Sequence, residues 1–120
     1  MKRRGIVAVV AAAVAMAAVS AGPASAEPTT QQYKDATGTA KDLYNLYLSA
    51  EEEAFGWANA SLSSKNQPQL YCPPKDLSMD ADATAALFDS FLTSHADKDF
   101  GKYPTGLILL TALQAKYPCS

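Results

Sequence analysis

The chain has 120 residues, a net charge of −2 and 48% hydrophobic residues, which suits one small globular domain. Three of its ten basic residues and none of its twelve acidic residues lie in the first 26 positions, so residues 27–120 carry a net charge of −5. That balance argues against nucleic acid as a partner, because nucleic-acid affinity comes largely from Lys and Arg neutralising phosphates.

Residues 1–26 have the three parts of an export signal. Basic residues at positions 2–4 precede an uncharged apolar run at 6–19, and Ala24-Ser25-Ala26 supplies the small residues that a signal peptidase requires. The apolar run is shorter than the roughly 20 residues of a membrane-spanning helix. We therefore expect cleavage near Ala26, a periplasmic or secreted protein, and no stable membrane anchor.

The two cysteines, Cys72 and Cys119, both follow the predicted cleavage site. An even pair in an oxidising compartment predicts a disulfide bond. Closing a loop of about 48 residues contributes roughly 4 kcal/mol in the chain-entropy model. We further expect this bond to hold the last two helices as an antiparallel pair.

The first half of the exported part predicts a flexible lead-in followed by two helices. Residues 27–38 are polar and read as the lead-in. Thr39 is a plausible N-cap of a first helix, whose apolar side chains Leu43, Leu46 and Tyr47 have helical spacing. Ser49 and Glu52 resemble a capping box, which predicts that a second helix starts there. That helix presents Phe55, Ala58 and Leu62 on one face, with Trp57 beside them.

The second half predicts a loop and two further helices. Consecutive prolines around Cys72 exclude helix over residues 65–76. Ser78 is a candidate N-cap for the third helix, and Pro104 suits the first position of a fourth. The fourth helix is apolar over most of its circumference, so we expect it to be central. The predicted fold class is all-α: a bundle of about four helices at 39–120, closed by one disulfide.

Residues for catalysis are sparse. His95 is the single histidine, and a surface position near a helix end accounts for it. A zinc site would need further His or Cys ligands, and both cysteines are expected in the disulfide. Asp80 and Asp82 are too close in sequence to face each other as a glycosidase pair. We expect no enzyme activity, no metal and no cofactor.

The most plausible binding segment is the loop 95–103. It places Phe100 and Tyr103 among Asp97, Asp99 and two lysines, and aromatic residues among charged ones can anchor a protein interface. These four residues are the candidate partner-binding residues. The alternative is that Phe100 folds back over the core as a lid.

Residues 71–119 resemble the Rap/Tai family of immunity proteins, exported proteins that neutralise amidase toxins delivered by type VI secretion. The resemblance rests on Tyr71-Cys72-Pro73-Pro74, on Tyr103-Pro104 before a Leu-rich helix, and on Tyr117-Pro118-Cys119 at the end. Family members often carry a second cysteine pair in the first two helices, and this chain has none there. Phe55-Gly56-Trp57-Ala58 is similar to a stretch of the HdeA acid-stress chaperones.

The resemblance implies an all-α protein that binds and occludes a peptidoglycan amidase. The alternatives are an acid-stress chaperone and an exported domain with an unrelated protein partner. Self-association into a homodimer is compatible with the sequence.

Overall fold

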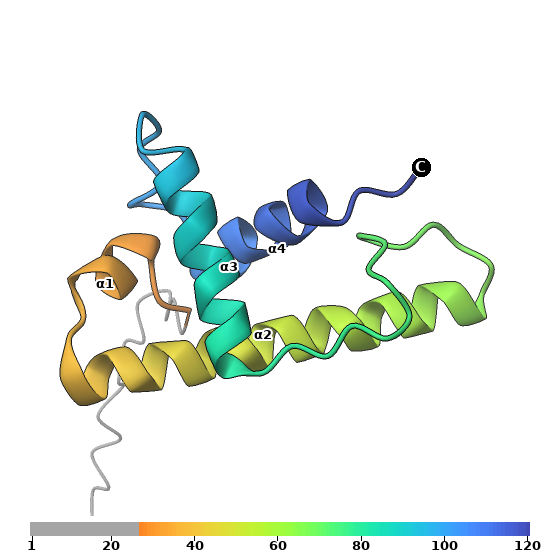
Figure 1. The fold of residues 1–120 in the computed structure, drawn as a ribbon, viewed down its shortest axis with the longest axis horizontal. Helices are drawn as coiled ribbons and strands as arrows, with labels where there is room; N and C mark the ends of the chain where they lie inside the picture. The colour runs from red at the N-terminus through yellow and green to blue at the C-terminus, as the bar shows by residue number, and fades with distance from the viewer. Residues whose placement is uncertain (1–26) are drawn as a thin grey trace, which may run out of the picture.

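The computed structural model describes residues 27–120, so the predicted signal peptide lies outside the described residues. Four helices follow one another: α1 (Thr30–Asp35), α2 (Gly38–Ser64), α3 (Ala81–Ser94) and α4 (Thr105–Lys116). No strand occurs in this part of the chain, and the all-α prediction is confirmed. In Figure 1, α2 runs along one side of the molecule, and α3 and α4 pack above it. These two helices cross steeply, so the expected antiparallel pairing is wrong.

Residues 27–38, expected to be a flexible lead-in, instead contain α1. Thr29 and Gln32 form a complete capping box, which fixes the start of this short helix. Tyr33 is buried, with its ring edge-on to Phe88 at 4.8 Å between centroids and its hydroxyl donating to Asp89 at 2.8 Å. One buried aromatic residue therefore orders a segment whose composition is mostly polar.

The two helices expected at 39–62 are one continuous helix, α2. Gly38 has φ 55°, a left-handed conformation that suits glycine at the turn from α1. Beyond it, no Pro or Gly interrupts the chain before Gly56, and Leu48 is fully buried near the middle. Ser49 therefore lies within the helix instead of capping one, and Glu51 to Glu53 lie mid-helix rather than in a first turn.

The core forms where α2, α3 and α4 meet. The prediction that the fourth helix is central holds for Ile108, Leu109 and Leu113, which are all buried. Other helices and the loop before α3 contribute Tyr33, Leu48, Tyr71 and Phe88 to the same cluster. Leu107 on the same helix is 50% exposed, so α4 keeps one large apolar side chain at the surface.

The helix ends differ from the predictions by one or two residues. Asp80, not Ser78, caps α3 by accepting a hydrogen bond from the Ala83 N–H at 2.8 Å. Pro104 occupies the N-cap position of α4, one residue before the expected place.

The predicted disulfide joins Cys72 to Cys119. Beside it, the Cys72 N–H donates to the carbonyl of Tyr117 at 2.8 Å. The loop before α3 is also held to α2 by Asn59, which is buried and bonds both Leu70 N–H and the Tyr71 carbonyl.

Candidate functional site

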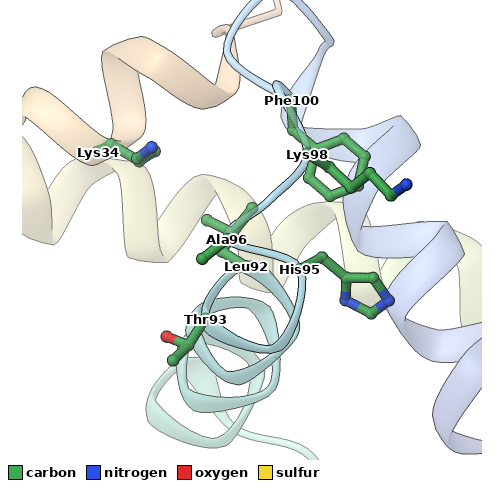
Figure 2. Close-up of a pocket in the computed structure, with 7 residues that line it drawn as sticks. All are labelled: Lys34, Leu92, Thr93, His95, Ala96, Lys98 and Phe100. Carbon is green, nitrogen blue, oxygen red and sulfur yellow. The ribbon is translucent and has the colours of Figure 1, made fainter.

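The loop 95–103 lies against α1 and the end of α3. The Thr30 N–H donates to the Tyr103 carbonyl at 2.9 Å, and the Gln31 N–H donates to the Gly101 carbonyl at 3.1 Å. A pocket of about 310 Å³ opens between these segments. Figure 2 shows its lining side chains, which come from α1, the end of α3 and the loop: Lys34, Leu92, Thr93, His95, Ala96, Lys98 and Phe100.

Phe100 packs against the core. Its ring stacks on Phe91 at 5.8 Å between centroids and lies 6.3 Å from the ring of His95. The His95 ring itself lies on Phe91 at 4.2 Å, and its Nδ1 is 2.9 Å from the Phe91 carbonyl. The half-buried Phe100 therefore has the position expected of a lid over the core, the alternative that the sequence leaves open.

The other three candidate residues of this loop are exposed. Tyr103 is 48% exposed, and Asp99 caps the turn by accepting from the Gly101 N–H at 3.1 Å. Asp97 pairs with Lys98 at 3.7 Å, with both side chains more than 60% exposed. A surface ion pair of this kind stabilises a fold very little. The loop thus presents charges but one exposed aromatic ring only.

A larger apolar surface lies on α2, on the side away from the core. Leu43 and Leu46 are each 63% exposed, Tyr47 is 38% exposed and Trp57 is 70% exposed. Residues 43, 46, 47, 50, 54 and 57 share one face at 3.6 residues per turn, roughly opposite Leu48. We call this face, with Ala50 and Ala54 between its large side chains, the outward stripe. Its large side chains are exposed, whereas Leu48 on the opposite side of the helix is fully buried.

Two grooves flank the outward stripe. The first, of about 320 Å³, lies between α2 and α4 and is lined by Glu27, Glu51, Ala54, Phe55, Gly106, Leu107 and Leu110. The second, of about 340 Å³, lies between α2 and the loop before α3 and is lined by Glu52, Glu53, Gly56, Trp57, Ala60, Leu77 and Met79. The stripe and its grooves together form an extended surface, apolar in the middle and acidic at the edges.

Glu27 and Glu51 meet at the start of α4. The Gly106 N–H donates to Glu27 Oε1 at 2.8 Å, and the Thr105 hydroxyl donates to Glu51 Oε1 at 3.2 Å. Gly106 permits this approach, since a Cβ there would clash with both carboxyl groups. Burial first, and then the neighbouring carboxyl group of Glu27, raise the pKa of Glu51 to about 8. Two carboxyl groups side by side favour a shared proton.

Other chemistry is not assembled in the described part of the chain. No three His, Cys, Asp or Glu side chains gather there to hold a metal ion. None of the helices at 27–120 is long and apolar enough to cross a membrane. Comparisons with protein families, characterised proteins and solved structures found no significant match to this chain.

The sequence prediction gave Leu43, Leu46 and Tyr47 only as apolar residues with helical spacing, and so did not identify the outward stripe. A signal was present: α2 has two apolar faces, because Tyr44, Leu48 and Phe55 also have helical spacing. A helix with apolar residues on opposite sides cannot bury both in a domain that covers it on one side.

Proposed function

We propose that this protein is an exported binding domain that captures another protein on the outward stripe of α2. The observation that carries the proposal is the exposure of Leu43, Leu46 and Trp57 in one row on a single rigid helix. Contiguous exposed apolar side chains with a polar edge mark protein interaction sites, and Trp is enriched among the residues that dominate binding energy. The disulfide suits an oxidising compartment outside the cytoplasm.

The proposed partner is a peptidoglycan amidase, which the domain would bind and occlude as an immunity protein. This part of the proposal rests on the resemblance of residues 71–119 to the Rap/Tai family. The occluding surface would be α2, because a helix held along its other side by the core loses little conformational freedom on binding.

The test mixes the protein, purified after export from an expressing bacterium, with amidases encoded beside its gene. We expect a complex at micromolar concentration and slower cleavage of peptidoglycan. Trp57→Ser should weaken the complex by at least about tenfold, as expected for a central aromatic anchor. Tyr103→Ser is the matched control, an exposed aromatic residue in the loop 95–103. If Tyr103→Ser weakens the complex and Trp57→Ser does not, the loop is the interface and the outward stripe is not.

A further inference from the structure

The edges of the outward stripe are acidic. Helical geometry puts Asp42 and Glu53 along one edge and Glu51 along the other. Two of these three carboxyl groups also adjoin a groove: Glu53 lines the groove beside Trp57, and Glu51 lines the groove beside Leu107. A partner that covers the apolar residues must therefore approach carboxyl groups on both sides.

No cation of the described residues neutralises these edges. Asp42, Glu51 and Glu53 form no ion pair there; the ion pair that the structure contains is Lys98–Asp97, in the loop 95–103. Lys41, the basic residue nearest in sequence, is held elsewhere. Its Nζ donates to the Tyr33 carbonyl at 2.7 Å and lies 3.4 Å from the centre of the Tyr33 ring.

The groove between α2 and α4 suits a long side chain with a cationic end. Its walls are Ala54, Phe55, Leu107 and Leu110, and carboxyl groups of Glu27 and Glu51 line it as well. Glu51 Oε2 is buried, and no side chain other than the neighbouring carboxyl group of Glu27 is placed to bond it. The alkyl stem of Lys or Arg packs on apolar walls while its charged end donates to a carboxylate.

We propose that the outward stripe binds an amphipathic helix of the partner protein, with a Lys or Arg side chain of that helix inserted into the α2–α4 groove toward Glu51. This inference rests on the proposed function and adds the chemistry of the partner. A second copy of this chain fits less well, because it would bring another acidic edge against Asp42 and Glu53, and like charges across an interface are unfavourable.

The test uses two synthetic helical peptides of about 18 residues, which is five turns. The first has leucines on one face and lysines at the edges, and the second has glutamine in place of each lysine. Calorimetry with the exported protein should give a Kd for the lysine peptide about tenfold lower than for the glutamine peptide. The advantage should shrink with added salt, because screening weakens attraction between exposed charges.

Single substitutions distinguish the contribution of the α2–α4 groove to peptide binding from that of the outward stripe. Measured at pH 9, where Glu51 is ionised and lysine is still charged, Glu51→Gln should weaken the lysine peptide by about fivefold and leave the glutamine peptide unchanged. Asp97→Asn removes one negative charge far from α2 in sequence and should change either Kd by less than about twofold. Leu46→Ser and Trp57→Ser should weaken both peptides, since they remove apolar contact area.

Each contrary result has a distinct meaning. One such result is that Glu51→Gln changes the Kd of the lysine peptide no more than Asp97→Asn does, while Leu46→Ser and Trp57→Ser still weaken binding. In that case the proposed insertion of a cationic side chain is wrong, and the outward stripe remains the interface. Failure of the stripe variants to change binding overturns the proposed function as well. No binding of the lysine peptide at about 100 µM overturns the proposed partner chemistry. Sedimentation that shows a dimer, dissociated by Leu46→Ser, would mean that a second copy covers the stripe.

Discussion

Glu51 shows how one residue acquires its properties from the fold. Its sequence neighbours, Glu52 and Glu53, suggest an ordinary charged run, but the start of α4 brings Thr105 and Glu27 against it. Its pKa of about 8 means that the folded protein binds a proton there that the unfolded chain loses near pH 4.5. The contribution of Glu51 to stability is therefore greatest below pH 4.5 and declines as pH rises toward 8.

We predict that Glu51→Gln reduces the pH dependence of unfolding. The melting temperature of the wild-type protein should fall between pH 5 and pH 8.5, and that of the variant should fall less, because glutamine stays neutral. Glu53→Gln is the matched control, with the same charge change on the exposed side of α2. Equal pH dependence in all three proteins would contradict the raised pKa. Because protonation of Glu51 stabilises the folded state at low pH, it also opposes the acid-induced opening that the chaperone alternative would require of the domain.

Phe100 is the residue for which the sequence left two roles open. Because its ring packs on Phe91 at the edge of the core, we predict that Phe100→Ala lowers the free energy of unfolding by about 2 kcal/mol. This is less than the 3–5 kcal/mol of a fully buried ring, since Phe100 is only partly buried. Urea unfolding of Phe100→Ala measures this loss of unfolding free energy. Tyr103→Ala, the exposed control, should cost less than about 1 kcal/mol, and equal costs would show that Phe100 is not part of the core.

At the scale of elements, α2 organises the domain. Its inner side supplies Leu48 to the core and its outer side carries the outward stripe, so a single helix serves both packing and proposed binding. Asn59 gives it a third role, because its side chain holds the loop before α3. The Leu70 N–H donates to Asn59 Oδ1 at 2.7 Å, and Asn59 Nδ2 donates to the Tyr71 carbonyl at 2.9 Å.

Asn59→Ala should therefore destabilise the fold well beyond an ordinary surface change. Removing the amide leaves two backbone groups without their partners, at a cost of about 1–3 kcal/mol each when they are buried, so we expect a loss of about 2–4 kcal/mol. Urea unfolding of Asn59→Ala beside Ser61→Ala, an exposed neighbour on the same helix, measures the difference. Amide hydrogen exchange at Leu70 and Tyr71 should accelerate in the first variant only. Unchanged exchange would show that the loop is held by other contacts.

At the scale of the whole molecule, the disulfide joins the loop after α2 to the end of the chain after α4. The two cysteines are 47 positions apart. Besides the disulfide, few contacts hold the last residues: a backbone hydrogen bond from Cys72 to Tyr117 and partial packing of the Tyr117 side chain on the core. The bond is therefore expected to act chiefly by restricting the unfolded chain.

We predict that Cys72→Ser with Cys119→Ser lowers the free energy of unfolding by about 4 kcal/mol. The helices should persist under native conditions, since the buried cluster at Leu109 and Leu113 does not include either cysteine. Denaturant unfolding and far-ultraviolet circular dichroism measure the two effects. Mass spectrometry of the exported wild-type protein should find no free thiol, and two free thiols would remove the disulfide from this account.

The amino-acid sequence by itself determined the features that depend on local chemistry. The prolines at 73 and 74 exclude helix, Leu-rich spacing predicts α4, and an even pair of cysteines after a predicted signal peptide predicts their bond. Each of these follows from residues whose own geometry or reactivity permits few alternatives.

Only the tertiary structure decided the features that depend on packing between distant segments. The order of α1 comes from Tyr33 against Phe88, which are 55 positions apart. The continuity of α2 comes from a core that contacts both of its halves, which outweighs the local capping signal at Ser49. Which of the two apolar faces of α2 is buried depends on where α3 and α4 pack. Helical periodicity cannot answer that question, because it identifies the faces of a helix but not the neighbour that covers one of them.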